Sequence, residues 1–242
     1  LYTNTVGSNN AAFGYQALYS NTANSNSAFG YKALLSNTTG YGNSAFGRDS
    51  LKANTFGLNN SAFGVYALTG NTTGVNNVAV GWGSLNANTI GNYNTAVGYE
   101  SLASSTASNN SAFGYTSLYN NTTGTGNSAF GFQSLVTNTT GSKNIAVGRD
   151  ALRTNTIGIN NTAMGHQALY SNTTGNYNSA VGLQSLYNNT IGAQNSAFGT
   201  YALINNTTGS YNTAVGYSVL LSNTFGKYNT SVGRTSMYSN TT

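Results

Sequence analysis

Few side chains in this sequence have the chemistry that catalysis or metal binding requires. The 242 residues include three acids, one histidine and no cysteine. His166 has no second histidine with which to share a metal ion, so we interpret it as a surface variant. Asp49 and Asp150 each lie in an R-D-x-L-K/R stretch, which predicts a local ion pair on the surface. Glu100 stands alone. The paired carboxylates of acid–base catalysis are therefore missing, and we expect no enzymatic activity, metal site or cofactor.

Tyrosine is the abundant residue type with a possible binding role. The chain has 18 tyrosines, and an apolar ring with a polar tip suits interfaces. Two interpretations stay open: stacked tyrosine ladders that stabilise a rod or its subunit contacts, and a face that binds a sugar or a protein. The candidate surface contacts share one place in a repeated pattern and are Tyr15, Tyr31, Tyr99, Tyr115 and Tyr217.

Asn-x-Ser/Thr sequons are frequent in a chain so rich in Asn and Thr. If these asparagines stand at the tips of turns, their side chains are accessible to a glycosylation system. The candidate glycosylation sites are Asn37, Asn71, Asn138, Asn172 and Asn206.

All of these residues belong to one repeated unit. The glycine of an Ala-Phe/Val-Gly motif recurs from Gly14 to Gly233 every 17 residues, apart from two steps of 16. We number the positions of a repeat from its first Asn, so that Asn26 is position 1 and Gly42 is position 17. Because a linear array of repeats is one cooperative body of any length, we predict a single array over residues 1–242. The chain begins in mid-repeat, which predicts that it is part of a longer array.

The period of two in side-chain type predicts a strand over positions 1 to 5. Position 1 is Asn and position 5 is Gly in all fourteen repeats, and position 3 is Ala in all but the last. We expect Phe or Val at position 4 and Leu at position 9 to form the core, with roughly 1.5–3 kcal/mol from burying each side chain. The small Ala and Gly columns imply that another backbone comes close, either the opposite wall of a thin coil or a neighbouring subunit. Positions 6 to 11 are too few for a stable helix, so we predict a second strand there.

Turns and side-chain ladders complete the predicted coil. The N-T-T-G stretch predicts a turn, and we expect an irregular turn in the two shorter repeats, which lack its glycine. The invariant Asn at position 1 and Thr at position 13 predict ladders in which each side chain bonds its copy in the next coil. The predicted fold is an all-β parallel β-solenoid or β-roll of fourteen 17-residue repeats. If one repeat is one coil, fourteen coils at about 4.8 Å each give a length of about 67 Å; the sequence leaves the number of residues per coil open. The predicted ladder residues are Asn26, Asn43, Asn60, Asn77, Thr38, Thr55 and Thr72.

Composition narrows the classes of partner. Charged residues make up 5% of the chain, against about 25% in an average soluble domain. The net charge of +5 comes from scattered basic residues without a run or stripe, so we expect no nucleic-acid partner. No apolar run approaches the roughly 18 residues of a membrane span. Without cysteine, neither disulfides nor thiolate metal sites can form.

Two stretches carry a resemblance to a known family. NNVAVGWGS at Asn76–Ser84 and NIAVGRDA at Asn144–Ala151 resemble the head repeat of trimeric autotransporter adhesins, roughly N-S-V-A-I-G-x-x-S. Similar arrays occur in tail-fibre-like proteins. The resemblance implies a left-handed parallel β-roll, three chains side by side, that binds host matrix or another surface. The S-N-T-T-G segment is longer than the family's coil and implies an extra turn, and the sequence here shows no coiled-coil stalk or membrane anchor.

These observations favour a structural component of an extracellular filament, fibre or adhesin shaft, at a cell surface or on a virion. Its main partner would be itself, as a homo-oligomer or an end-to-end filament. One alternative is an adhesin or receptor-binding rod whose Tyr columns bind glycan or a host surface protein. Another is an ice-binding protein with a flat face of small-x-Thr ranks such as Ser20/Thr22 and Thr137/Thr139.

Overall fold

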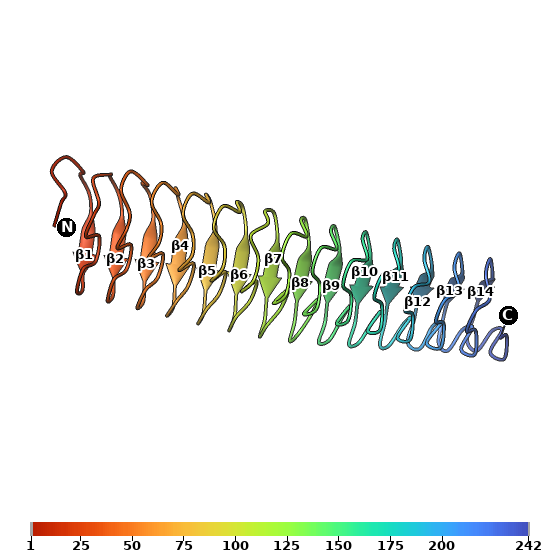
Figure 1. Cartoon of the computed structure of the whole chain (residues 1–242). Coiled ribbons are helices and arrows are strands. Elements are labelled where there is room, and N and C mark those ends of the chain that lie inside the picture. Colours follow the sequence, from red (N-terminus) through yellow and green to blue (C-terminus); the bar gives the residue numbers. More distant parts are fainter. Residues whose placement is uncertain (1, 242) are drawn as a thin grey trace. The chain divides into compact units, whose positions relative to one another are not determined.

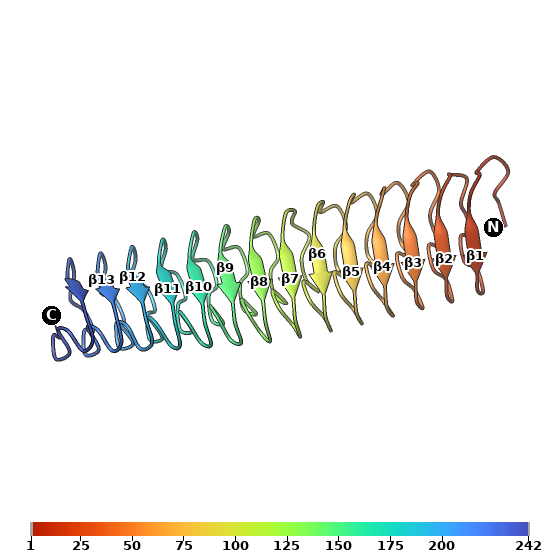
Figure 2. The same ribbon diagram turned by 180° about the vertical axis from the view of Figure 1, so that it is seen from behind.

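The computed structural model describes residues 2–241, and these form fourteen short β-strands and no helix. The described residues divide into two compact units, 2–123 and 124–241. In both units every repeat contributes one three-residue strand, and consecutive strands pair in parallel (Figure 1; Figure 2 gives the view from behind). Each unit is therefore a parallel β-solenoid, as predicted, and the structure shows that one repeat is one coil. The single array over 1–242 stays a prediction.

The strands occupy positions 2 to 4 of their repeats. In the first unit they are β1 (Ala11–Phe13), β2 (Ser27–Phe29), β3 (Ser44–Phe46), β4 (Ser61–Phe63), β5 (Val78–Val80), β6 (Thr95–Val97) and β7 (Ser111–Phe113). In the second unit they are β8 (Ser128–Phe130), β9 (Ile145–Val147), β10 (Thr162–Met164), β11 (Ser179–Val181), β12 (Ser196–Phe198), β13 (Thr213–Val215) and β14 (Thr230–Val232).

The register stacks equivalent positions directly on one another. Ala45 of β3 lies opposite Ala62 of β4, and Ala163 of β10 opposite Ala180 of β11. Even the 16-residue repeat keeps this register, because Ala12 pairs with Ala28. The missing residue is therefore absorbed in the turns and not in the strand.

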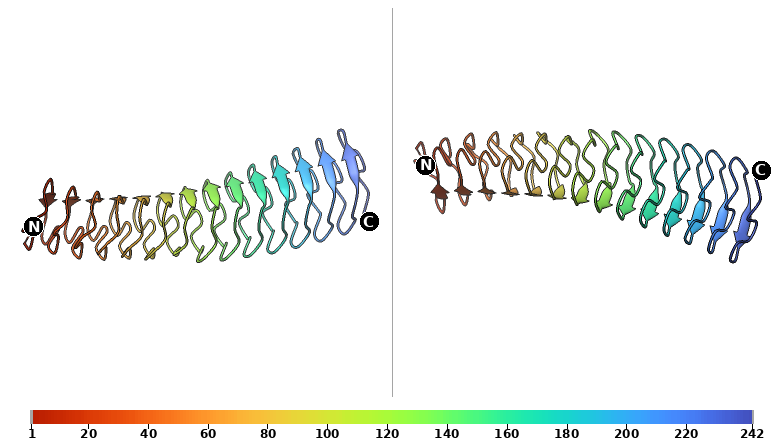
Figure 3. Two further views of the ribbon diagram at one scale, coloured as in Figure 1. Left: turned by 90° about the horizontal axis from the view of Figure 1, so that it is seen from above. Right: turned by 90° about the horizontal axis from the view of Figure 1, so that it is seen from below.

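The prediction of a second strand at positions 6 to 11 is wrong, because this stretch is a series of turns. Positions 7 and 9 take left-handed backbone angles throughout, for example φ of +56° at Asp49 and +48° at Leu51. The turned backbone still bonds to both neighbouring coils: the Asp49 N–H donates to Tyr31 O at 2.9 Å and the Leu51 N–H to Ala67 O at 3.0 Å. Coil-to-coil bonding thus continues beyond the strands, along the side of each unit that faces away from them (Figure 3).

The core is thin and consists of small side chains and leucine. The Ala at position 3 and the Leu at position 9 are fully buried in every interior coil, as at Ala79 and Leu85. The prediction for the Leu column is confirmed. Because the Ala column is buried by its own chain, the neighbouring backbone implied by the small side chains includes the opposite wall of the same coil.

The prediction that position 4 belongs to the core is wrong. Phe46 and Phe63 are 36% and 41% exposed. A strand sends alternate side chains to opposite faces, so the buried Ala at position 3 forces positions 2 and 4 outward. The interior of the coil is too narrow to hold a phenylalanine ring beside the Leu column.

Candidate functional site

Two ladders of buried asparagines run through each unit. At position 12, the Asn71 amide donates to Asn54 Oδ1 at 2.7 Å and to Gly74 O at 3.1 Å. At position 1, the Asn60 side chain donates to Asn43 Oδ1 at 3.2 Å and to Gly74 O at 2.8 Å. The same Oδ1 of Asn43 accepts the Asn60 backbone N–H at 3.0 Å. These asparagines are fully buried, so each hydrogen bond replaces one that water would otherwise make.

The predicted position-1 ladder of Asn26, Asn43, Asn60 and Asn77 is therefore confirmed. The threonine column also links successive coils, but its bonds end on backbone. The Thr38 hydroxyl donates to Thr55 O at 3.0 Å, Thr55 to Thr72 O at 3.2 Å and Thr72 to Thr89 O at 3.0 Å. The ladder at position 12 was not predicted, although Asn at that position is almost as regular as at position 1.

The sequon asparagines belong to this second ladder, so the expectation that they are accessible at turn tips is wrong. Each has no exposed surface, and its amide nitrogen, the atom to which a glycan is attached, donates hydrogen bonds within the ladder. The residues concerned are Asn37, Asn71, Asn138, Asn172 and Asn206.

In each unit the outer face of the strands is uncharged and combines an apolar column at position 4 with a column at position 2 that is mostly Ser and Thr. We call it the sheet face and define it as positions 2 and 4 of the coils. Position 4 carries only Phe, Val and Met, and position 2 carries Ser, Thr, Ala, Val and Ile. The rings of Phe29, Phe46 and Phe63 stack in series with centroids 4.7 and 5.0 Å apart. All charged residues of the chain lie at positions 6, 7, 10, 16 and 17 and so outside this face.

The candidate tyrosines at position 6 are exposed, between 42% and 63%. They stack on one another: Tyr15 on Tyr31 at 5.4 Å, and Tyr99 on both Trp82 at 5.1 Å and Tyr115 at 5.3 Å, with rings nearly parallel. Burial, with a smaller contribution from Glu100, raises the pKa of Tyr99.

Stacking limits what these rings can bind. A sugar docks on an aromatic face, and within a parallel stack the faces cover each other, leaving ring edges and hydroxyls to solvent. Tyr217 is an exception, because it meets Tyr201 edge-on at 5.9 Å and has Arg234 over its ring. This geometry supports the ladder interpretation of the tyrosines more than the glycan-binding one.

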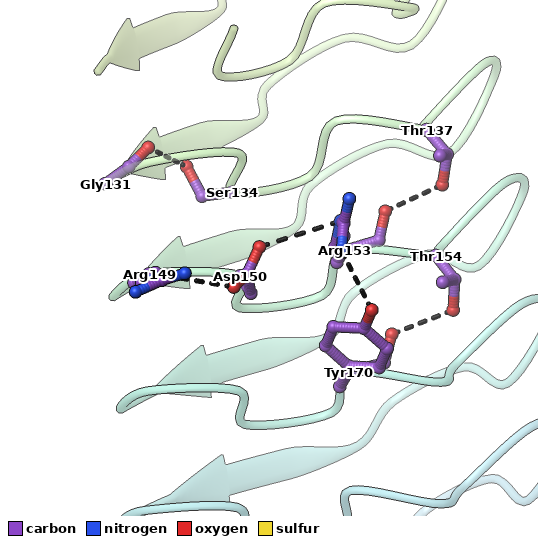
Figure 4. Close-up of polar contacts among 8 residues, drawn as sticks. All are labelled: Gly131, Ser134, Thr137, Arg149, Asp150, Arg153, Thr154 and Tyr170. Carbon is purple, nitrogen blue, oxygen red and sulfur yellow. Dashed lines mark hydrogen bonds and ion pairs between the residues drawn. The ribbon is translucent and has the colours of Figure 1, made fainter. Parts of the chain in front are cut away.

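The two R-D-x-L-K/R stretches form compact charged clusters. Asp150 lies between Arg149 and Arg153, with Oδ2 3.3 Å from Arg149 Nε and Oδ1 3.6 Å from Arg153 Nε (Figure 4). Asp49 is placed in the same way between Arg48 and Lys52. The expected local ion pairs are confirmed, and their cations are exposed. The carboxylates are not on the surface, because Asp49 and Asp150 are only 8% and 5% exposed.

The first short repeat leaves a hollow in the row of turns. A cavity of about 600 Å³ is lined by Val6, Thr22 to Ser25, Thr39 and Tyr41. Its floor is the shortened turn, where Asn24 Oδ1 accepts the Ser8 N–H at 2.8 Å. The expected irregularity is confirmed here, and the polar atoms of this floor are paired with one another.

Other classes of site have less support in the described part of the chain. No group of three His, Cys, Asp or Glu side chains is close enough to hold a metal ion. No helix among residues 2–241 is long and apolar enough to cross a membrane. The threonine hydroxyls of the expected ice-binding ranks are engaged between coils, as Thr154 is with Tyr170 O at 2.8 Å. Comparison with family models, with curated proteins and with solved structures gave no match.

Proposed function

We propose that this protein is a structural repeat protein, a segment of an extracellular filament, fibre or adhesin shaft that assembles from copies of itself. The solenoid and its asparagine ladders support a structural role, because the invariant side chains are used in stacking one coil on the next. In this proposal the chain performs no catalysis, and its role is to form a regular, extended surface.

The observation that carries the proposal is the exposed sheet face. The largest exposed apolar patch on a soluble monomer is typically a few hundred Å², which is about the size of the sheet face of one unit, and such a patch is often an interaction site. Position 4 side chains are exposed or half-buried in every coil, and Phe13 is the most exposed at 75%. A face of this composition favours contact with another apolar surface.

A second copy of this chain is the occupant that fits. The side chains of the sheet face recur with the spacing of the coils, about 4.8 Å, and another copy has the same spacing. The net charge of +5 does not oppose this contact locally, because no charged residue lies on the face. Shape, spacing and polarity are therefore all self-complementary.

The available area sets how strong the contact can be. Seven strands at about 4.8 Å, each about 10 Å long, give roughly 340 Å² of flat sheet per unit. A stable interface buries about 800 Å² on each partner. The sheet face of one unit alone falls short of this area, so the strength of the contact must grow with the number of coils that take part.

Negative-stain electron microscopy of the wild type beside Phe46→Lys/Phe63→Lys tests the proposal. We expect the wild type to form particles with several chains in cross-section, and the double variant to give thinner, dispersed ones. Phe56→Lys is the matched control, because Phe56 is 58% exposed on a turn away from the sheet face. Thin, dispersed wild-type particles would contradict the proposal.

A further inference from the structure

The charged residues of this chain are concentrated in a way that stacking does not explain. Of its eight basic and three acidic residues, six stand in the two motifs Arg48–Lys52 and Arg149–Arg153. Most other coils carry Gln, Tyr, Thr, Ser or Gly at the position of the aspartates, so coil stacking does not require a carboxylate there. The two motifs lie in different units, and each is a local cluster.

In the first cluster one nearly buried carboxylate holds two exposed cations. Asp49 Oδ2 lies 3.6 Å from Arg48 Nε and Oδ1 lies 3.2 Å from Lys52 Nζ. The Asp49 side chain is 11% exposed, whereas those of Arg48 and Lys52 are 52% and 39% exposed. The Arg48 guanidinium also lies 4.6 Å from the centroid of the Tyr66 ring. Contacts to Asp49 and Tyr66 thus fix the cation while its outer end faces solvent.

Lys32 adds a third positive charge from the preceding coil. Hydrogen bonding to Tyr31, with a smaller contribution from Asp49, raises the pKa of Lys32. Three cations and one acid leave the first cluster with a net charge of about +2.

The second cluster repeats this arrangement (Figure 4). Arg149 is 67% exposed and lies over the Phe132 ring at 5.5 Å. Arg153 donates from Nη1 to the Tyr170 hydroxyl at 2.9 Å. In both clusters the first arginine meets the aspartate through Nε. Among residues 2–241 no acceptor takes a hydrogen bond from Nη1 or Nη2 of Arg48 or Arg149. The fork that binds carboxylate, sulfate or phosphate in bidentate fashion therefore points outward.

From this geometry we propose that each cluster is a binding site for one anionic group of an acidic polysaccharide, a sulfate ester or a uronate carboxylate. The buried aspartate orients the cations, and the outer guanidinium nitrogens with the neighbouring ammonium or guanidinium take the anion. Tyrosine hydroxyls beside each cluster, such as Tyr31 and Tyr170, can bond the sugar hydroxyls.

The source of the anion follows from charge and spacing. Another copy of this chain is a poor source, because Asp49 and Asp150 are nearly buried in the clusters themselves and Glu100 is the one other acidic side chain in the sequence. A nucleic acid carries a phosphate on every nucleotide and requires a basic stripe, whereas these clusters are isolated. A sugar polymer that presents one sulfate or carboxylate to each cluster suits single clusters separated by uncharged coils. The proposal does not depend on assembly into a fibre, since each cluster lies within one unit.

The test is isothermal titration of the full chain with sulfated maltotetraose and with tetragalacturonate. We expect at least one of them to bind with two ligands per chain, and unsulfated maltotetraose not to bind. Arg48→Gln/Lys52→Gln should remove binding at the first cluster and leave the second, whereas Arg149→Gln/Arg153→Gln should remove binding at the second and leave the first. At the altered cluster we expect the affinity to fall about tenfold or more. Lys143→Gln/Lys227→Gln removes the same charge elsewhere and should keep two ligands.

Arg48→Gln/Asp49→Asn/Lys52→Gln is the control for misfolding, because the double variant leaves the buried Asp49 carboxylate without its cations and this triple variant removes that carboxylate as well. It should melt close to the wild type and still lack the first site. No binding of either acidic sugar would overturn the proposal. Equal weakening by the Lys143/Lys227 variant would overturn it too, as that indicates unspecific attraction. Equal or tighter binding of a thymidine tetranucleotide would refute the assignment to polysaccharide.

Discussion

Two glycines of one coil allow a sharp test of how closely the coils approach. Gly81 at position 5 has φ of +128°, and a Cβ there would lie 2.5 Å from Gly98 O and 2.8 Å from Gly98 C in the next coil. Gly83, two residues on, has φ of +61°, and its Cβ would meet only Glu100 Cγ, at 3.4 Å. Position 7 carries non-glycine residues with φ near +55° in the other coils, such as Gln133 at +54°.

The expected magnitudes follow from these contacts. In Gly81→Ala the backbone angle costs about 1–3 kcal/mol and the overlap with the Gly98 backbone about as much again. We therefore expect a loss of about 4 kcal/mol in the free energy of unfolding. Gly83→Ala should cost at most about 1 kcal/mol, because its backbone angle is one that alanine can adopt. Both changes restrict the unfolded chain equally, so their difference reports the folded coil.

Trp82, the only tryptophan, lies between the two glycines and reports on this coil by fluorescence. Urea titrations followed by this signal and by circular dichroism compare the two variants with the wild type. If Gly81→Ala and Gly83→Ala have equal free energies of unfolding, or if Gly83→Ala is the less stable of the two, the close contact between coils at position 5 is refuted.

Further substitutions test the ladders, the core and the two proposed surfaces. Asn71→Asp loses both amide donors inside a buried ladder and should lower the free energy of unfolding by about 3 kcal/mol. Asn76 is exposed, so Asn76→Asp should change the free energy of unfolding little. Denaturant titration of both variants measures this difference. Leu85→Ala should lower the free energy of unfolding by about 2–5 kcal/mol in the same assay. Ile90 is 62% exposed, so Ile90→Ala should lower it by less than about 0.5 kcal/mol. Similar losses for the two variants would contradict the assigned core. Phe46→Lys/Phe63→Lys should weaken self-association with little change in melting temperature, and the cluster variants should each lose one acidic sugar in titration.

The sequence predicts the parts of this fold that stacking requires to be identical. Coils in register place each residue on its own copy, so an invariant Asn at position 1 can be satisfied by its neighbour, as Asn60 is by Asn43. The parallel pairing and the burial of Leu85 follow from the same argument. The length of one coil is shown only by the structure, in which strands of consecutive repeats pair directly, as β3 does with β4.

The sequence does not show which side of the strand faces inward. Alternation separates positions 2 and 4 from position 3, but it does not say which set is buried. Volume alone favours Phe46 inside, and only the thinness of the coil puts Ala45 there instead. The turned segment was missed for a related reason, because nothing in the identity of Leu51 signals its left-handed backbone.

For the site residues too, the local motif predicts one part of the structure and the neighbouring coils determine the rest. The asparagines of the sequons fit a glycosylation motif locally, and only the position of Asn71 above Asn54 shows that the amide is already engaged. The charged motif predicts the ion pairs but not the burial of Asp150, which depends on the coils above and below.

Sedimentation velocity of the purified chain tests the central claim, assembly through the sheet face, most directly. We expect the wild type to sediment as a multiple of 25.1 kDa, and Phe46→Lys/Phe63→Lys as a species of 25.1 kDa, with Phe56→Lys like the wild type. A wild type that stays at 25.1 kDa at every concentration, or a sheet-face variant that assembles as well as the wild type, would contradict the account.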